Sequence, residues 1–405
     1  MSVQMIQPHQ ADELIREHMP TYGATGVPVE EAAGRILRTA IRADRDLPPF
    51  DRVTMDGIAI DFAAWQSGQR QFSVHDTAVA GRPAPELTDS TRGCIQVMTG
   101  TMLPAGTNAV IPYEDLDLAE GVAVVHDTAD VVPLQHLHSQ ASDRRVGEII
   151  VPAGTRLRAP HISIAAAVGC ARVQVTCPPA VAIISTGDEL KQVDEPVEPF
   201  QIRSANDHGI RAALLRLGHN HVERFHVRDD LDATLQLLQQ LLNDFDVLIL
   251  TGGVSMGKRD FVPTALQECQ VQNHFHKIRQ KPGKPMWFGT SPSGKPVFAL
   301  PGNTVSTLVC LHRYVGPALA HAEGENDASP QWVRIQDAIR WPLPLTGFIP
   351  VRLVYSSAGI CSAVPCETNT SGDFAALSAS DGFVELPEGQ DLFPAGSIVQ
   401  YRAWQ

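Results

Sequence analysis

Apolar and polar positions change their spacing several times along the chain, and the most regular stretch lies between residues 180 and 320. There, short apolar runs such as 247–250 are typical of strands covered on both faces of a sheet. Between the runs, apolar residues recur every three or four positions, as at Leu231, Leu235 and Leu238, which indicates amphipathic helices. This alternation predicts a parallel sheet of βα units with right-handed crossovers. The expected strands are 181–185, 222–227 and 247–250, and the expected helices are 207–217, 231–242, 261–266 and 305–311.

The spacing differs on both sides of this stretch. A helical pattern is found in two segments, residues 8–39 and 147–178. One helix is expected to begin near Val29 and another to run from Pro160 to Gly169. Short apolar runs between Gly, Pro and Asp turns fill the intervening segment and return after residue 330, which predicts strands. We therefore predict an α/β multidomain protein. Its domains are a helical domain in two segments (1–45 and 147–178), an inserted β-rich domain (46–146), a parallel α/β domain (179–328) and a C-terminal β domain (329–405).

Composition narrows the classes of function. The chain has 405 residues, of which 43% are apolar and 19% charged, and a formal net charge of −13. An acidic balance argues against a nucleic acid or an anionic membrane as partner, and we expect no membrane span because no apolar run approaches about 18 residues. The first residues lack a basic segment followed by an apolar core, so we expect no signal peptide. Seven cysteines without a Cys-x-x-Cys pair suggest free thiols in the cytoplasm.

Three glycine-containing loops follow apolar runs within residues 246–304. They are Thr251-Gly252-Gly253-Val254-Ser255-Met256-Gly257, Lys281-Pro282-Gly283-Lys284-Pro285, and Pro301-Gly302-Asn303. Because glycine has no Cβ, the backbone N–H groups of such a loop can approach an anion closely. A single loop of this kind is usually an ordinary turn. Three of them in one α/β segment indicate a ligand site at the carboxyl ends of the strands.

Carboxylates are expected to converge on one edge of the sheet, opposite a group of lysines. Carboxylates follow three strands or strand loops, and a run of cations stands out in a chain that is acidic overall. The carboxylates are Glu189, Asp229 and Asp260, and the cations are Lys277, Arg279, Lys281 and Lys284. A carboxylate beside a phosphate-binding loop commonly holds a divalent cation, although a run of cations is usually a solvated face. Together with the glycine loops, these residues predict a pocket for a phosphorylated or oxyanionic ligand.

Four further residues are candidates outside the α/β stretch. Asp56 and Thr99 each precede a glycine at the end of a strand in the β-rich segment. Such a pair is typical either of an ordinary turn or of a functional loop. In the C-terminal segment, Arg352 and Ser371 can bind an anion or simply face solvent. The pattern of residues leaves these alternatives open.

Taken together, the motifs resemble the MoeA / gephyrin E-domain family of molybdopterin molybdenumtransferases over nearly the whole chain. The motifs that carry the resemblance are Met55-Asp-Gly57, Met98-Thr-Gly100, Ser185-Thr-Gly-Asp-Glu-Leu190, Asp246 to Asp260, Lys281-Pro-Gly-Lys-Pro285 and Leu300-Pro-Gly-Asn303. The resemblance implies the same four-domain architecture, with the α/β domain binding molybdopterin. It also implies an elongated homodimer whose active-site cleft takes residues from both subunits. The implied reaction converts molybdate and adenylylated molybdopterin into molybdenum cofactor and AMP, with Mg²⁺.

The resemblance also assigns expected roles to individual residues. Gly252, Gly253 and Ser255 are expected to contact the pterin phosphate or its adenylate, and Asp260 with Glu189 or Asp229 is expected to hold Mg²⁺. The expected ligands of molybdate or the terminal phosphate are Lys277, Lys281, Arg352 and Ser371. The expected catalytic set is Asp56, Thr99, Glu189, Asp229, Asp260, Lys277 and Lys281. The remaining expected binding residues are Thr251, Gly257, Lys284, Pro301, Gly302 and Asn303.

The chain departs from the family pattern at a few positions, which leaves alternatives. Thr304 replaces the usual proline and can instead cap the following helix, Lys258 and Arg259 replace acidic or aromatic residues, and Thr101 and Asn108 replace Ala and Asp. A divergent paralogue is therefore one alternative. The others are a molybdopterin adenylyltransferase-like enzyme, which resembles only residues 180–320, and a binding or scaffold protein without turnover. Tungstate in place of molybdate is a further alternative, which the sequence does not separate. The adenylyltransferase that supplies the substrate is an expected further partner.

Overall fold

The structure is a computed structural model that describes residues 5–254, 261–327, 329–366, 370 and 372–404. The described residues form two compact units. The first comprises the chain up to residue 38, residues 154–158 and the chain from residue 172 onward, and the second comprises residues 39–153 and 159–171. None of the helices in the described part of the chain is long and apolar enough to span a membrane.

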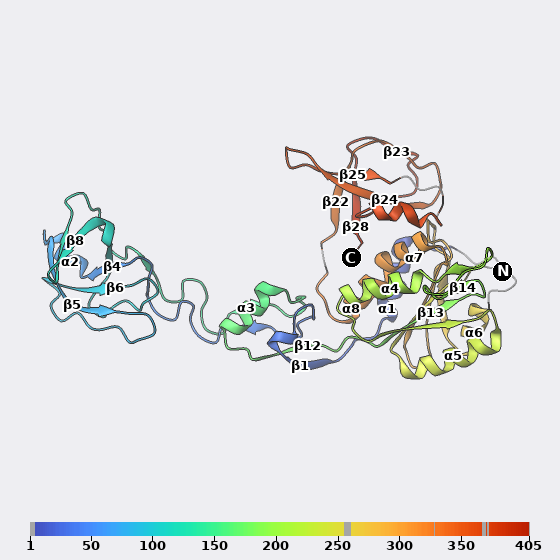
Figure 1. Cartoon of the computed structure of the whole chain (residues 1–405), viewed down its shortest axis with the longest axis horizontal. Coiled ribbons are helices and arrows are strands. Elements are labelled where there is room, and N and C mark those ends of the chain that lie inside the picture. Colours follow the sequence, from blue (N-terminus) through green and yellow to red (C-terminus); the bar gives the residue numbers. More distant parts are fainter. Residues whose placement is uncertain (1–4, 255–260, 328, 367–369, 371, 405) are drawn as a thin grey trace. The chain divides into compact units, whose positions relative to one another are not determined.

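A six-stranded sheet forms the centre of the first unit (Figure 1). Its order is β16 (Val222–Val227), β13 (Val181–Thr186), β17 (Val247–Thr251), β21 (Pro296–Leu300), β20 (Trp287–Thr290) and β18 (Gln272–His276). The first four strands are parallel, as predicted, whereas β20 pairs antiparallel with both of its neighbours, β21 and β18. The fully parallel sheet that we predicted is therefore wrong at this edge. Only residues 291–295 separate β20 from β21, and a connection this short cannot cross over to a parallel strand.

Helices cover both faces of this sheet (Figure 1). Alternate residues of β13 point to opposite sides, so Ile183 belongs to one apolar core and Ile184 to the other. Helices α1, α4 and α8 contribute to the first core, and α5 and α6 contribute to the second. The helices are α1 (Pro8–His18), α4 (Asn206–Arg216), α5 (Leu231–Asp244), α6 (Val262–Glu268), α7 (Thr304–Cys310) and α8 (Gly316–Ala322). The helices predicted in this stretch are confirmed.

The N-terminal segments differ from the prediction. The buried residues Ala11 and Ile15 of α1 belong to the first core of the sheet, whereas we predicted packing against residues 147–178. The helix predicted from Val29 is wrong, because only Val29–Glu31 form a 3₁₀ turn (η1). The adjacent apolar residues Ile36 and Leu37 are buried by isolated β-bridges to neighbouring segments. Strands β1 (Ala24–Pro28) and β12 (Arg172–Thr176) pair antiparallel beside them.

The second unit contains the inserted β-rich segment and helix α3 (Ala159–Ala167), both of which were predicted. Its six-stranded sheet carries an apolar core on each face: Ile58 of β4 belongs to one and Ala59 to the other. The strand order is β7 (Ala109–Pro112), β4 (Gly57–Ile60), β6 (Gly93–Val97), β5 (Gln71–Ala78), β9 (Val122–Val125) and β8 (Leu116–Ala119).

The C-terminal β domain, which was also predicted, is a closed barrel. Its strands pair in a circle, β24–β25–β22–β28–β26 and back to β24, around one apolar core. The strands are β22 (Gln331–Ile335), β24 (Thr346–Tyr355), β25 (Cys361–Pro365), β26 (Gly382–Leu386) and β28 (Ile398–Ala403). Phe348 and Phe383 of the barrel pack on Val305 and Val309 of α7. Strand β19 (Gln280–Lys281) adds to β24 in parallel, so the barrel is joined to the α/β part by packing and by a strand pairing.

Candidate functional site

The predicted glycine loops meet at the carboxyl ends of β17 and β21. Thr251 lies opposite Leu300 in the ladder, so the loops that follow leave the sheet side by side. The N–H of Gly252 donates to the carbonyl of Leu300 at 3.3 Å. A Cβ added at Gly302 would lie 3.6 Å from the Cα of Gly252. The two loops therefore form one surface, as the sequence predicted.

Glycine is required in the first of these loops. Gly252 and Gly253 have φ of +91° and +66°, a region that other residues rarely adopt. A Cβ on Gly252 would lie 2.9 Å from the carbonyl oxygen of Thr186, and one on Gly253 would lie 2.8 Å from its Oγ1. The loop thus packs directly on the end of β13. Ser255, Gly257 and Asp260, which were predicted to complete it, lie outside the described residues.

Asn206, at the start of α4, ties the two loops together. Its Nδ2 donates to Oγ1 of Thr251 at 3.0 Å and to the carbonyl of Gly302 at 2.7 Å. A further bond at 2.6 Å, from Oγ1 of Thr307 to the carbonyl of Pro301, fixes the second loop from below. Sequence reasoning missed Asn206, because an asparagine near a helix start is typical of an ordinary cap. Its only signal is its position after β13 in a βα unit.

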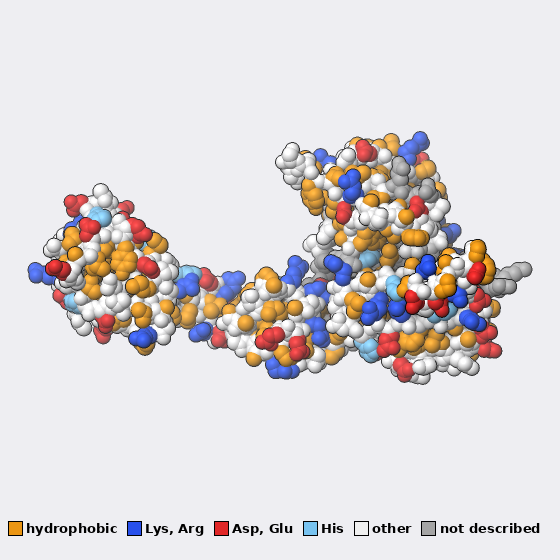
Figure 2. Space-filling model, in the orientation of Figure 1, with side chains coloured by type: hydrophobic (Ala, Val, Ile, Leu, Met, Phe, Trp, Pro, Cys, Tyr) orange, Lys and Arg blue, Asp and Glu red, His pale blue; other side chains and the backbone are white. Residues whose placement is uncertain are grey.

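Two of the four predicted cations line a cavity of about 460 Å³. Lys281 and Lys284 are among its lining residues, together with Gln280 and the loop of Pro301, Gly302 and Asn303. Both ammonium groups belong to exposed side chains. The structure therefore places two of the three predicted loops around one cationic hollow. Acidic and basic side chains are intermixed on the face that Figure 2 shows.

The other two predicted cations are placed differently. Arg279 is bound to Glu388 at 3.2 Å and to the carbonyl of Pro344 at 3.0 Å, so it joins the α/β part to the barrel. Lys277 has φ of +84°, and its N–H donates to the carbonyl of Met286 at 2.9 Å. Neither residue is among those that line the cavity. The charge run in the sequence thus combines residues that bind within the protein with residues that face the hollow.

Two loops that carry carboxylates, from the neighbouring strands β13 and β16, are in contact at this edge. The N–H of Asp229, after β16, donates to Oδ1 of Asp188, after β13, at 3.4 Å. Glu189 is exposed on the same loop as Asp188. Within the described residues, no group of three or more His, Cys, Asp or Glu side chains is arranged to hold a metal. Sequence reasoning chose Glu189 and Asp229 but missed Asp188, because two adjacent carboxylates cannot be ranked by spacing.

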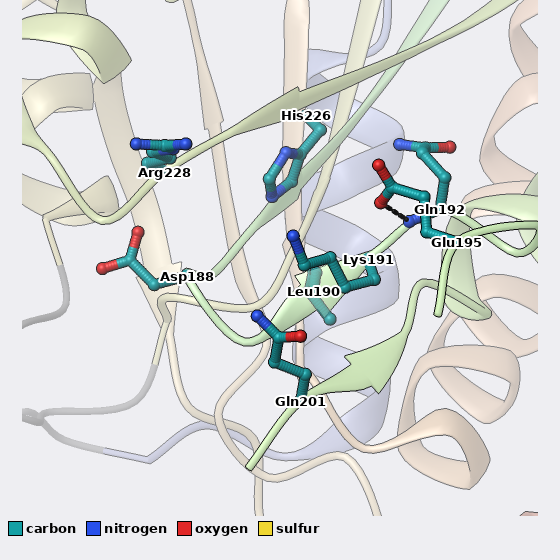
Figure 3. Close-up of a pocket in the computed structure, with 8 residues that line it drawn as sticks. All are labelled: Asp188, Leu190, Lys191, Gln192, Glu195, Gln201, His226 and Arg228. Atoms are coloured by element: carbon teal, nitrogen blue, oxygen red, sulfur yellow. Dashed lines mark hydrogen bonds between the residues drawn. The ribbon is translucent and has the colours of Figure 1, made fainter. Parts of the chain in front are cut away.

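A second, polar cavity of about 540 Å³ lies beside these carboxylates. Asp188 and Arg228 lie at one side of it, and Lys191 and His226 point into the same space (Figure 3). Nε2 of His226 contacts the carbonyl of Gly187 at 3.0 Å. These residues come from two separate segments of the chain, 188–201 and 226–228, so no motif spacing points to the cavity.

Asp56 and Thr99, predicted as separate candidates, form a pair in the second unit. Both the N–H and Oγ1 of Thr99 donate to Oδ1 of Asp56, at 2.6 Å and 2.7 Å. These two bonds lower the pKa of the Asp56 carboxyl below its usual range, and the bond from the backbone N–H contributes more than the bond from the hydroxyl. The next residue, Gly57, lets β4 lie close to β7, since a Cβ there would lie 2.0 Å from the carbonyl oxygen of Ile111. The result is an exposed carboxylate held in a fixed orientation.

The remaining predicted residues have mixed outcomes. Arg352 is exposed on β24 and does not line the cavity, and Ser371 lies outside the described residues. The segment beside Ser371 nevertheless approaches the site, because a Cβ added at Gly372 would lie 3.9 Å from Oδ1 of Asn303. Asn303 is the N-cap residue of α7 and Thr304 is its first residue, so our prediction that Thr304 caps this helix is wrong.

Comparison with known proteins adds three family models. They match the "MoeA N-terminal region (domain I and II)" over residues 6–169, a "probable molybdopterin binding domain" over 182–321, and the "MoeA C-terminal region (domain IV)" over 333–404. The molybdopterin molybdenumtransferase of Synechocystis is 37% identical over 99% of this chain and 100% of its own length. The enzyme of the same name from Synechococcus elongatus is 33% identical over 93% and 94%. The solved molybdopterin biosynthesis moeA protein of Pyrococcus horikoshii superposes with a TM-score of 0.82 at 28% identity, covering 99% and 100%.

Proposed function

The chain belongs to the MoeA family of molybdopterin molybdenumtransferases, and from this premise we propose that it inserts molybdate into adenylylated molybdopterin with release of AMP. Transfer of molybdenum to molybdopterin is the step that the names of its relatives describe. We propose the adenylylated form of the substrate, and AMP as the leaving group, because the sequence shares its motifs with the family. Both substrates are anions, so the site must neutralise several negative charges.

The observation that carries the proposal is the cavity between the Lys281–Pro285 loop and the Pro301–Asn303 loop. Lys281 and Lys284 supply two ammonium groups at its rim, in a chain of net charge −13. A tetrahedral oxyanion with two negative charges matches a hollow bounded by two cations. Gly252 and Gly253, which follow the neighbouring strand β17, have no side chains, so their backbone N–H groups can contact a phosphate.

We further propose that the carboxylates at the ends of β13 and β16 take part in binding Mg²⁺. Carboxylate oxygens are the donors that this ion prefers, and the 3.4 Å contact between the Asp229 N–H and Asp188 brings two carboxylate-bearing loops together. In this proposal Glu189, Asp229 and Asp260 hold the ion. When bound, the ion would offset the charge of the phosphate oxygens. Lys277, Arg352 and Ser371 remain proposed contacts of the oxyanion.

The proposal also includes a homodimer in the cytoplasm that receives its substrate from an adenylyltransferase. Asp56 and Thr99 belong to the second unit, whereas Lys281 belongs to the first. We propose that the pair enters the cleft of the partner subunit, as the family resemblance implies. The adenylyltransferase-like alternative is less favoured, because family models match on both sides of the molybdopterin-binding domain.

The test is formation of cofactor from purified adenylylated molybdopterin and molybdate. We expect AMP release and cofactor formation to require the protein, molybdate and Mg²⁺ together, with cofactor detected by reconstitution of a molybdenum-free enzyme. Tungstate in place of molybdate measures the choice of oxyanion. Binding of adenylylated molybdopterin without any turnover, with both oxyanions tried, would show a binding protein and refute the proposed reaction.

A further inference from the structure

Gln280 is a polar residue that is completely buried next to the exposed Lys281. The two are neighbours on β19, so their side chains point in opposite directions. Gln280 has no exposed surface, yet both ends of its amide are bonded. Its Nε2 donates to the carbonyl of Gly283 at 3.2 Å, and its Oε1 accepts a hydrogen bond from the hydroxyl of Tyr314.

Tyr314 fixes this amide from the helix beneath the loop. It is only 2% exposed and lies in the π-helical segment η3 (Leu311–Val315), between α7 and α8. π-Helical turns inside helices are rare and often occur at functional sites. The carbonyl of Gly283 can only accept a hydrogen bond, so the Nε2 end of the amide must face the turn and Oε1 must face the tyrosine hydroxyl, which donates to it. The orientation of the amide is therefore determined by its partners.

The turn itself has little freedom above this amide. Gly283 has φ of +92°, and a Cβ added there would lie 2.6 Å from both Sγ of Cys310 and Nε2 of Gln280. Sγ of Cys310 approaches the Gly283 carbonyl at 3.7 Å as a further weak donor. The N–H of Ile278 closes the base of the turn by donating to the carbonyl of Lys284 at 2.9 Å. Gln280 and Cys310 thus hold the backbone between the two lysines that line the cavity.

An apolar side chain could fill the space of Gln280 without the need to satisfy two polar ends. A buried amide is costly when any of its groups lacks a partner, so packing alone does not account for glutamine here. The feature that the amide supplies is a directed bond to the carbonyl of Gly283, in the middle of the Lys281–Lys284 turn. That bond sets the backbone from which both ammonium groups extend.

We propose that Gln280 and Tyr314 are positioning residues, which hold the Lys281–Lys284 turn in the geometry that binds the oxyanion substrate. The inference rests on the proposed function, because it assumes that this cavity takes molybdate. Tyr314 does not line the cavity, and Gln280, which is among its lining residues, has no exposed surface, so we assign both side chains a role in holding the turn. A small displacement of a binding group can lower activity strongly even when the substitution is remote, so loss of the pair should raise KM for molybdate more than it changes kcat.

The experiment separates positioning from stability with three variants, Gln280→Met, Tyr314→Phe and the double variant. Each single variant leaves a buried polar partner unsatisfied, so both melting temperature and molybdate affinity should fall. The double variant leaves no unpaired group between positions 280 and 314, and the carbonyl of Gly283 keeps only the weak donor Cys310, so part of the stability lost in the single variants should return. We expect its melting temperature to recover towards wild type while its affinity for molybdate, measured by calorimetric titration, stays about tenfold weaker. Affinity that recovers together with melting temperature would overturn the inference.

Two controls complete the design. Tyr401→Phe removes another buried tyrosine hydroxyl, bonded to the carbonyl of Asp381 at 2.9 Å inside the barrel, and should lower stability without changing molybdate affinity. If the double variant stays unstable, Tyr314→Phe is compared with Tyr401→Phe, and equal affinities would also overturn the inference. Lys281→Ala tests the underlying site. If it binds molybdate as tightly as wild type, the proposed cavity is wrong; if it alone loses affinity, only the positioning role is wrong.

Discussion

Lys281 is an exposed cation on a turn that lines the cavity, and it offers the most direct test at the scale of one residue. A charge-assisted contact contributes about 1.5–3 kcal/mol, so Lys281→Ala should weaken molybdate binding about tenfold or more at 25 °C. Lys281→Arg should recover little, because a planar fork does not replace a compact ammonium group. Stability should hardly change, since the side chain is exposed. Calorimetric titration of molybdate measures the affinity of each variant.

Lys191→Ala is the matched control for this prediction. Lys191 lines the second cavity rather than the one at Lys281, so its removal should leave molybdate affinity unchanged. Equal losses in the two variants would show a general effect of charge instead of a site.

The residues that sequence reasoning found share one property: they belong to short motifs in which glycine permits a close approach. Gly252 and the Pro301–Asn303 loop were predicted in this way and do meet. Asn206 and Gln280 were missed, because each acts through a partner about 30 to 100 residues away. Such partners are set by tertiary packing, and neither propensity nor spacing carries that information.

The same limit appears at the scale of the element. Strand β17 was predicted because a continuous apolar run fits a strand buried on both faces. The helix expected from Val29 failed, because Ile36 and Leu37 are buried by bridges to other segments rather than by a helical face. Tertiary contacts there override local preference. The antiparallel edge was missed because it depends on the five-residue connection before β21, which spacing of apolar residues does not reveal.

Arg313 joins three elements of the first unit and gives a prediction at this scale. It is bound to Asp12 of α1 at 2.7 Å and to Glu385 of β26 at 3.0 Å, and its side chain is only 7% exposed. Arg313→Met would leave two carboxylates without their partner, and breaking a mostly buried ion pair costs about 3 kcal/mol. Urea unfolding should show a loss of that size.

Arg16→Met is the matched control for Arg313. Arg16 also pairs with an aspartate, Asp327, but both side chains are more than half exposed. An exposed pair contributes about 0–1 kcal/mol, so its loss should be small. Similar losses in the two variants would mean that Arg313 does not join the elements as described.

At the scale of the whole molecule, a buried pair predicts how stability depends on pH. Oε1 of Glu323 lies 3.3 Å from Nδ1 of His219, and both side chains are almost completely buried. The pair is located where α8 ends beside Thr176 of β12. Burial raises the pKa of Glu323 to about 7 and lowers the pKa of His219 to about 4. The raised acid pKa adds stability below pH 4.5 that is lost as pH rises through 7. The lowered histidine pKa adds stability above pH 6.5 that is lost as pH falls through 4.

The variant Glu323→Gln removes only the first of these contributions. Relative to wild type, it should gain stability as pH rises from 4.5 to 7, by about 3 kcal/mol in total, because one unit of pKa shift corresponds to about 1.4 kcal/mol. Melting temperatures of both proteins at pH 5 and pH 8 check this. A parallel pH dependence of the two proteins would mean that Glu323 titrates normally in the folded state.

The proposed homodimer leads to a test of how the active site is divided between subunits. Asp56 and Lys281 lie in different units of the chain, and we propose that a working site takes Asp56 from one subunit and Lys281 from the other. Dimers that combine one Asp56→Asn chain with one Lys281→Ala chain would then hold one intact site and one doubly altered site. Heterodimers isolated with two different tags should show about half of wild-type cofactor formation, since the two sites of a symmetric dimer are equivalent. At molybdate concentrations below the KM of the wild type, each homodimer should show about a tenth of wild-type activity or less. If both residues act within one subunit, every site in the heterodimer carries one substitution, and activity should stay as low as in the homodimers.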